Sequence, residues 1–201
     1  MVPDSYKINP PVFDVWMRLL EGVEGSVLWL VAGSATVKSN LRREAENRGV
    51  EPSRLVFAPR LAYADHLARF KLADLFLDTL PFNAGTTASD ALWAGVPVLT
   101  CSSEAFASRM AGSLLNAVGL PELVTHNMEE YEVLALKLAT TPGVLAEFRT
   151  RLARNRTTYP LFDTDRFRRH IEAAYITMRE RYQRGEPPES FAVHPIRRVI
   201  Q

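Results

Sequence analysis

The residues with the clearest chemical potential lie in the stretch from Asp78 to Asp90, which reads DTLPFNAGTTASD. Gly85 allows a backbone to approach a ligand closely, and Thr86 and Thr87 offer hydroxyl and N–H groups where a helix is expected to begin. The dipole of that helix favours an anion such as phosphate at this end. Asp90 lies on the same side one turn later, where its carboxylate can accept hydrogen bonds from ribose hydroxyls. The spacing therefore fits a site for a phosphate and a sugar.

The same spacing also fits an ordinary helix cap, in which Thr87 caps the helix and Asp90 reaches back to it. Caps are far commoner than nucleotide sites, so the spacing by itself favours the cap.

A second candidate pair, His66 and Arg69, shares one face of the helix predicted over 64–71. An imidazole can stack on a base while a guanidinium bonds to a carbonyl or a phosphate. The alternative, which the pair taken alone favours, is a solvated helix face with Asp65 as a partner for these side chains. Lys7 is a lone lysine before the first predicted helix, and such a position is most often simply surface.

Apolar runs alternate with helical patterns through the first two thirds of the chain. We expect strands at 26–32, 54–58, 74–78, 96–100 and 123–124, and helices at 10–22, 36–48, 64–71, 87–93 and 104–118. The first of these strands suits burial on both faces. Parallel strands need crossover connections, which helices supply, so the pattern predicts an α/β fold with a doubly wound, Rossmann-like parallel sheet. Ligands bind such sheets beyond the carboxyl ends of the strands.

The last third of the chain predicts only helices, at 128–140, 142–156 and 163–184. We therefore expect a lobe with trailing helices at 1–184 and a C-terminal arm or tail at 185–201. The three tryptophans sit within apolar patterns and are expected in the core: Trp16, Trp29 and Trp93.

Arginines dominate the segment between residues 149 and 184, which has ten arginines, no lysine and four acids. Such a segment can bind nucleic acid or an acidic partner. More often, arginines spread over amphipathic helices lie along the parent domain and pair with its carboxylates, and this second interpretation is favoured.

Length and composition restrict the class of protein. With 201 residues, 47% of them hydrophobic and 23% charged, the chain matches one folded domain. The net charge of +1 gives no overall electrostatic field that would attract nucleic acid or an acidic membrane.

Cys101 is the only cysteine, so a reducing cytoplasm is the expected location. The histidines are far apart, and we expect no metal site. No stretch reaches the length of about eighteen apolar residues that a membrane span needs.

Several familiar catalytic motifs are missing from the sequence. It has no G-x-G-x-x-G, no G-x-x-x-x-G-K-[ST], no G-x-S-x-G and no H-E-x-x-H. Classical dinucleotide binding, P-loop chemistry, α/β-hydrolase chemistry and zincin chemistry are therefore disfavoured.

A set of short motifs, taken together and in order, resembles one family. They are Tyr6-Lys7-Ile8-Asn9-Pro10, SVLWL at 26–30, HLAR at 66–69, LADL at 72–75, LDT at 77–79, TTASD at 86–90, LWAGVP at 92–97 and ASR at 107–109. The chain resembles the C-terminal catalytic lobe of the protein O-linked N-acetylglucosamine transferases and their bacterial relatives, from about residue 5 to about residue 184.

The resemblance implies a type B glycosyltransferase, in which two Rossmann-like lobes face each other across a cleft and the C-terminal lobe holds the donor. The implied reaction is an inverting, metal-independent transfer of N-acetylglucosamine from UDP-N-acetylglucosamine to Ser or Thr of proteins, without a cofactor. The implied partners are the UDP-sugar, a protein acceptor, and the N-terminal lobe and tetratricopeptide repeats of a full-length protein.

The resemblance also implies roles for six residues at the donor, namely Lys7, His66, Arg69, Thr86, Thr87 and Asp90, and Gly85 is added to this site for its backbone freedom alone. Lys7 would neutralise the diphosphate and, together with the helix end, stabilise charge on the leaving UDP. His66 would stack on the uracil, and Arg69 would help to hold the base. The paired threonines would contact phosphate, and Asp90 would hold the ribose.

The chain departs from the family pattern at three places. Gly85 stands where the animal enzymes have histidine, and Tyr63 stands where they have lysine, so phosphate and base contacts are expected to be weaker or the donor different. Val2-Pro3 stands where the family usually has Phe-Asn. Acceptor-side residues are expected in the missing lobe, so residues 1–201 alone should bind donor nucleotide weakly and catalyse little or no transfer.

Three alternatives remain open from the sequence. One is another enzyme of the same fold that uses a UDP-sugar, such as a small-molecule glycosyltransferase or a sugar-nucleotide epimerase. Another is a non-catalytic interaction module that keeps the fold without the chemistry. The third is nucleic-acid binding through the arginine-rich segment, which would depend strongly on salt.

Overall fold

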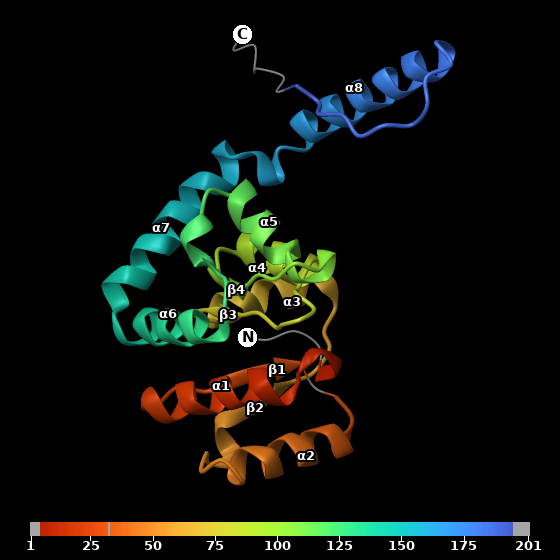
Figure 1. Ribbon diagram of the computed structural model, residues 1–201. Helices are drawn as coiled ribbons and strands as arrows, with labels where there is room; N and C mark the ends of the chain where they lie inside the picture. The colour runs from red at the N-terminus through yellow and green to blue at the C-terminus, as the bar shows by residue number, and fades with distance from the viewer. Residues whose placement is uncertain (1–4, 32, 195–201) are drawn as a thin grey trace.

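The computed structural model describes residues 5–31 and 33–194, and its strands are all parallel. One sheet pairs β1 (Leu28–Val31) with β2 (Leu55–Ala58), and the other has the order β3 (Phe76–Leu77), β4 (Val98–Cys101), β5 (Val124–Thr125). The predicted α/β fold with parallel strands is confirmed (Figure 1). Among the described residues, hydrogen bonding divides the expected single sheet into these two.

Helices make the crossovers between the strands. They are α2 (Ala35–Glu46), α3 (Tyr63–Arg69), α4 (Thr86–Ala94) and α5 (Met110–Ala117), and α1 (Pro10–Gly22) precedes the first strand. The remaining helices are α6 (Met128–Thr140), α7 (Pro142–Thr158) and α8 (Thr164–Gln183). Short 3₁₀ turns are η1 (Ser5–Lys7), η2 (Pro52–Arg54), η3 (Phe70–Leu72), η4 (Phe106–Ser108), η5 (Pro121–Leu123) and η6 (Pro160–Phe162).

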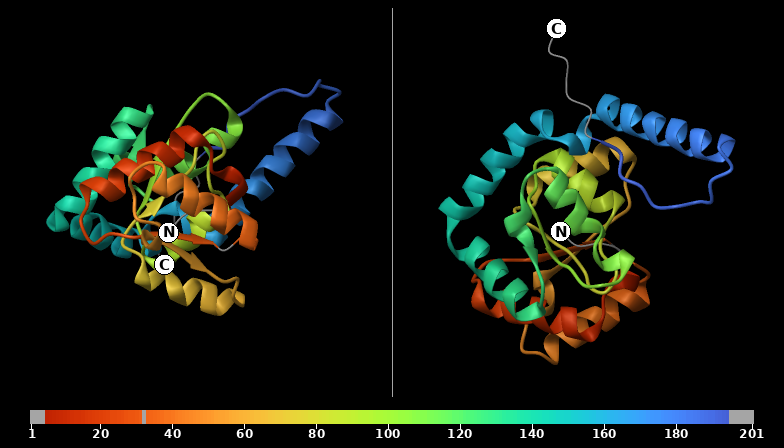
Figure 2. Two further views of the ribbon diagram at one scale, coloured as in Figure 1. Left: turned by 90° about the horizontal axis from the view of Figure 1, so that it is seen from below. Right: turned by 45° about the horizontal axis from the view of Figure 1, so that its top comes forward.

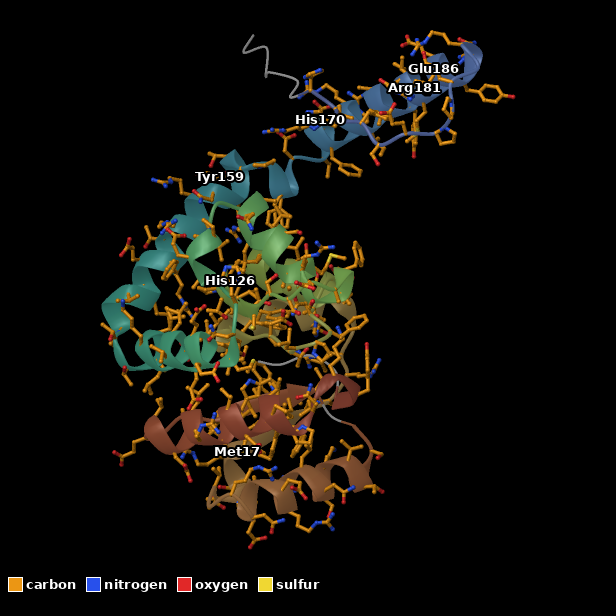
Figure 3. The ribbon with its side chains drawn as sticks, in the orientation of Figure 1. Met17, His126, Tyr159, His170, Arg181 and Glu186 are labelled. Carbon is orange, nitrogen blue, oxygen red and sulfur yellow. The ribbon has the colours of Figure 1, made fainter. Side chains whose placement is uncertain are left out.

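The start of α1 shows how local sequence positions the elements. The side chain of Asn9 accepts a hydrogen bond from the N–H of Val12 at 3.1 Å, and two prolines follow the cap. This arrangement satisfies a first-turn N–H and restricts the backbone to helical values. The apolar face of α1 then packs against α6, and the indole N–H of Trp16 donates to the Tyr131 hydroxyl at 3.3 Å. Met17, labelled in Figure 3, lies in the same buried cluster.

Three sequence predictions about the elements need correction or qualification. The helix expected at 104–118 begins only at Met110, because the carbonyl of Ala107 accepts a hydrogen bond from the distant N–H of Asn83 at 2.9 Å. Trp93 is 51% exposed rather than in the core, and it packs edge-on against Phe162. β1 is not fully buried on both faces, because Trp29 is only partly covered.

Some expectations fall on residues outside the described part of the chain. These are the departure at Val2-Pro3, the end of the first strand at residue 32, and the arm beyond residue 194. Residues 186–194 follow α8 without regular secondary structure. The division into a lobe at 1–184 and an arm at 185–201 stays a prediction.

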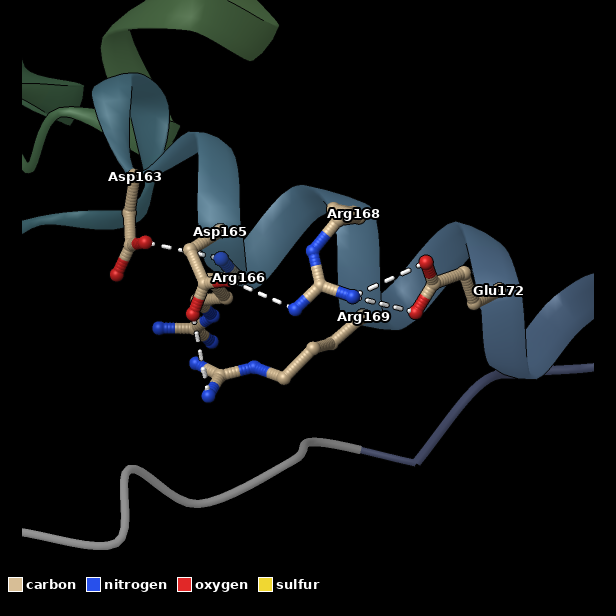
Figure 4. A network of polar contacts seen from close by, with 6 residues as sticks. All are labelled: Asp163, Asp165, Arg166, Arg168, Arg169 and Glu172. Carbon is tan, nitrogen blue, oxygen red and sulfur yellow. Dashed lines mark hydrogen bonds and ion pairs between the residues drawn. The ribbon is translucent and has the colours of Figure 1, made fainter.

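The arginine-rich helices pair extensively with carboxylates. Figure 4 shows Arg168 between Asp165 and Glu172, with contacts of 2.8 Å to each, and Arg169 bonded to Asp165 at 3.3 Å. These pairs lie within α8. The predicted pairing with carboxylates of the rest of the domain is confirmed for Arg149, which contacts Asp74 at 3.3 Å, and for Arg151, which contacts Glu122 at 2.8 Å. The absence of nucleic-acid binding stays a prediction. No described helix is long and apolar enough to cross a membrane.

Candidate functional site

The N-terminus of α4 is the centre of the candidate site. α4 begins at Thr86, and Gly85 occupies the capping position without a side-chain cap hydrogen bond. The N–H of Ser89 already bonds to the carbonyl of Gly85 at 2.9 Å. No cap side chain therefore accepts from the first-turn N–H groups, and an anion is the partner that such an end attracts.

The alternative of an ordinary capping box is wrong for this helix. Thr87 lies inside the first turn instead of at the cap, because the cap is Gly85, two residues earlier. The Asp90 carboxylate accepts a hydrogen bond from the Tyr63 hydroxyl at 2.8 Å. This bond raises the pKa of the Tyr63 phenol, since ionisation would remove the proton that Asp90 receives.

His66 and Arg69 lie one turn apart on α3 and contact each other. The Arg69 guanidinium approaches Nδ1 of His66 at 2.7 Å. A guanidinium only donates, so Nδ1 accepts and the imidazole is neutral, with its proton on Nε2. Partial burial and then the Arg69 charge lower the pKa of His66, which agrees with a neutral ring.

Arg69 is buried rather than part of a solvated face. It is 8% exposed, and its Nη1 donates to the carbonyl of Pro59 at 2.6 Å. Its Nε is buried and unpartnered. Arg69 therefore lies behind His66 and orients that ring, and its expected direct contact with a base stays a prediction.

Lys7 reaches the loop that leads into α4. Its Nζ donates to the carbonyl of Asn83 at 3.0 Å and lies 4.3 Å from the centre of the Phe82 ring. The neighbouring Asn9 side chain donates to the carbonyl of Leu80 at 2.5 Å. Two contacts thus join this early segment to the loop, and the acceptor of Lys7, Asn83, is two residues before Gly85 in the chain.

The structure brings the predicted residues into one neighbourhood. Lys7 holds the loop before α4, α4 carries Thr86, Thr87 and Asp90, and the Tyr63–Asp90 bond joins α4 to the helix that carries His66. Their individual roles toward a ligand stay predictions. Among the described residues, no group of three or more His, Cys, Asp or Glu side chains is placed to hold a metal ion.

Sequence reasoning missed one residue of this neighbourhood, Asp78. It is 2% exposed and lies directly after β3. Burial raises the pKa of its carboxyl to about 6, while hydrogen bonds and the nearby Lys7 charge act in the opposite direction. The sequence feature that could have identified Asp78 is a carboxylate directly after an apolar strand, because ligands bind parallel sheets beyond the carboxyl ends of the strands.

Comparison with known protein families gives one match over most of the chain. The family described as Glycosyl transferase family 41 matches residues 3–171.

The similar curated proteins are named as enzymes that act with UDP-N-acetylglucosamine on peptides. A UDP-N-acetylglucosamine–peptide N-acetylglucosaminyltransferase of Caenorhabditis elegans is 39% identical over 90% of this chain and 16% of its own length. A probable enzyme of the same name from Arabidopsis thaliana is 37% identical over 94% of this chain and 19% of its own length. The chain thus spans less than a fifth of these two relatives.

Similar solved structures agree in fold. An O-GlcNAc transferase variant from Thermobaculum terrenum superposes with a TM-score of 0.83 at 37% identity, over 89% of this chain and 35% of that one. A putative UDP-N-acetylglucosamine 2-epimerase from Listeria monocytogenes gives a TM-score of 0.51 at 19% identity, over 96% of this chain and 46% of that one. The second likeness shows the fold alone.

Proposed function

The chain belongs to glycosyl transferase family 41, and we propose that it binds the nucleotide of UDP-N-acetylglucosamine for transfer of the sugar to Ser or Thr of proteins. The observation that carries this proposal is the start of α4, which lacks a side-chain cap and lies next to a lysine held at the preceding loop. First-turn N–H groups and one ammonium suit a diphosphate, which has negative charge on both phosphates.

The other residues of the neighbourhood suit the nucleoside. The Asp90 carboxylate accepts hydrogen bonds from ribose hydroxyls, for which the Tyr63 hydroxyl is a competing donor. The neutral His66 ring stacks on the uracil, and Arg69 fixes the orientation of that ring from behind. Gly85 adds no side chain at the point where the phosphates approach the backbone.

The transfer itself is a displacement at the anomeric carbon of the sugar. The acceptor hydroxyl oxygen forms a bond to that carbon, and the bond from the carbon to the β-phosphate oxygen breaks with its electron pair. UDP leaves with increased negative charge, which Lys7 and the N-terminus of α4 stabilise. The hydroxyl proton passes to a base. We place that base and the acceptor groove outside residues 1–201, as the chain spans only 16% and 19% of two curated relatives.

Under this proposal the isolated chain binds donor nucleotide weakly and transfers little or no sugar. Donor binding needs no metal, so adding a chelator leaves UDP affinity unchanged. The N-terminal lobe, the tetratricopeptide repeats and the cytoplasmic location that the sequence suggested remain part of the proposal.

Calorimetric titration of UDP, with ADP as the competing nucleotide, tests the proposal on the chain of residues 1–201. We expect saturable binding of UDP in preference to ADP. Lys7→Ala and Asp90→Ala should each weaken UDP binding at least about tenfold, the equivalent of about 1.4 kcal/mol.

Matched controls remove a lysine and an aspartate at positions outside the candidate site. Lys38→Ala acts on α2, and Asp74→Ala removes an exposed carboxylate that pairs with Arg149. Both should leave UDP affinity unchanged. The absence of saturable UDP binding by a folded sample, or equal affinity for ADP, contradicts the proposal. A longer protein that releases an epimerised sugar nucleotide or a glycosylated small molecule would contradict the protein acceptor. UDP binding by residues 1–201 would in that case still support the donor site.

A further inference from the structure

The loop between β3 and α4, residues 78–85, is fastened by one buried carboxylate. Oδ1 of Asp78 accepts hydrogen bonds from the N–H of Thr79 at 2.8 Å and from the N–H of Ala84 at 2.7 Å. Oδ2 accepts from the hydroxyl of Thr100 on β4, also at 2.7 Å. A single side chain therefore ties both ends of the loop together and attaches them to the neighbouring strand.

Further contacts stiffen the interior of the same loop. The Thr79 hydroxyl donates to the carbonyl of Phe82 at 2.8 Å. The Asn83 amide donates to the carbonyls of Thr79 and Cys101, at 2.8 and 3.2 Å. The carbonyl of Asn83 is also the acceptor for Lys7. The position of the lysine ammonium thus depends on a loop that Asp78 closes.

The groups behind Asp78 hold its backbone as well. The Tyr131 hydroxyl on α6 donates to the carbonyl of Asp78 at 3.0 Å, and Tyr131 is 0% exposed. Among the titratable groups around this carboxylate, the charge of Lys7 from η1 lowers the pKa of Asp78. The charge of Asp78 in turn raises the pKa of Cys101 on β4 and of Tyr131 on α6. A buried carboxylate is costly unless hydrogen bonds satisfy it, and here three do so.

From this geometry we infer that Asp78 is the positioning residue for the diphosphate end of the donor site. Ala84, which Asp78 holds, directly precedes Gly85 and the first turn of α4. Asp78 therefore fixes where the first-turn N–H groups and the Lys7 ammonium stand before a ligand arrives, and such preorganisation is what makes hydrogen-bond donors effective toward developing charge. At 2% exposure it acts through these groups and does not touch the ligand. The inference rests on the proposed function for the identity of the anion.

The first test distinguishes an effect on diphosphate binding from an effect on nucleoside binding. Affinities for UDP and for uridine are measured by NMR titration of the chain of residues 1–201 and of its variants. Asp78→Ala should weaken UDP binding at least about tenfold and change uridine binding less than about threefold. Asp78→Asn should largely restore UDP affinity, because its carbonyl oxygen can still accept from both backbone N–H groups and its amide can donate to Thr100.

A pair of threonine variants gives a matched control. Thr100→Val removes the hydrogen bond to Oδ2 and should weaken UDP binding about threefold, again without loss of uridine affinity. Thr125→Val removes a buried hydroxyl that donates to the carbonyl of Thr100 instead of to a residue of the loop, so both affinities should stay unchanged. If Asp78→Ala does not fold, the threonine pair still decides, and equal losses for UDP and uridine in Thr100→Val overturn the inference.

A second test needs no ligand. Amide hydrogen exchange at Thr79 and Ala84 should become at least about tenfold faster in Asp78→Ala, or measurably faster in Thr100→Val, while exchange in β2 stays unchanged. Unchanged exchange at Ala84 in both variants overturns the inference. If the wild-type chain binds no UDP, the proposed function fails on its own, and the exchange measurement still shows whether Asp78 fixes this loop.

Discussion

At the scale of single residues, the protein keeps a carboxylate where water cannot reach it. Asp78 has no exposed surface of consequence, and its charge is compensated by hydrogen bonds and by the nearby Lys7. Burial raises its pKa to about 6, against an ordinary value of 3.8. Such a group makes the stability of the fold depend on pH.

The sign of that dependence follows from the two pKa values. Between about pH 4 and about pH 6 the unfolded chain has already lost the Asp78 proton while the folded chain keeps it, so the free energy of unfolding falls as pH rises through this window. Asp78→Asn lacks this contribution. On going from pH 7 to pH 4, the free energy of unfolding of the wild type should rise relative to that of the variant by about 2 to 3 kcal/mol.

Urea unfolding, followed by tryptophan fluorescence at pH 4, 5, 6 and 7, measures this difference. Other titrating groups are common to both chains and cancel in the comparison. A difference that stays constant across the four pH values would contradict the raised pKa of Asp78.

At the scale of elements, the site depends on how α3 meets α4. The two helices pack together, and the Tyr63 hydroxyl on α3 donates to the Asp90 carboxylate on α4 at 2.8 Å. Tyr63 is 64% exposed, whereas Asp90 is 9% exposed. The Asp90 oxygen that we propose for ribose binding is therefore already engaged by an accessible phenol of α3.

Removing the phenol hydroxyl should free that oxygen for the sugar. We expect Tyr63→Phe to bind UDP about threefold more tightly, because the ribose no longer competes with an internal hydrogen bond. The affinity for 2′,3′-dideoxy-UDP, which lacks the hydroxyls that Asp90 would hold, should not change. Calorimetric titration of both nucleotides checks this, and weaker UDP binding by the variant would show that Tyr63 orients Asp90 instead of competing for it.

At the scale of the whole molecule, α8 stands apart from the packed elements. It extends away from the sheets in every view (Figure 1, Figure 2), and Ala174 is its only buried residue. Figure 3 places Arg181 and Glu186 at its far end, where they form an ion pair with an N–O distance of 3.5 Å. α6, by contrast, buries Tyr131, Ala135 and Leu138. Helices owe most of their stability in proteins to such packing.

The difference in packing predicts a difference in local stability. In the chain of residues 1–201, amide hydrogens of α8 should exchange with solvent much faster than those of α6, because α8 opens without exposing a packed face. Hydrogen exchange followed by mass spectrometry of peptides from the two helices measures this. Equal protection of α6 and α8 would contradict it.

Much of the local architecture could be predicted from the sequence. The periodicity predicts α1 and α6 with the bounds that the structure has, and the alternation of apolar runs with helical patterns predicts parallel strands. The glycine and threonines at 85–87 predict the start of a helix, and α4 begins at Thr86, whereas anion binding at this end stays a prediction. These features depend on side chains within one or two turns of each other, which the sequence contains in order.

Other features depend on partners far along the chain. The predicted helix at 104–118 is shortened because Ala107 bonds to Asn83, and Lys7 reaches the loop before α4 across more than seventy residues. Arg69 is buried behind His66 by a bond to Pro59. The sequence by itself determined which groups with useful chemistry exist and which local elements carry them. Only the tertiary structure decided which are buried, which are already bonded, and that Asp78 closes the loop, because burial and hydrogen bonding are set by atoms that meet only when the chain folds.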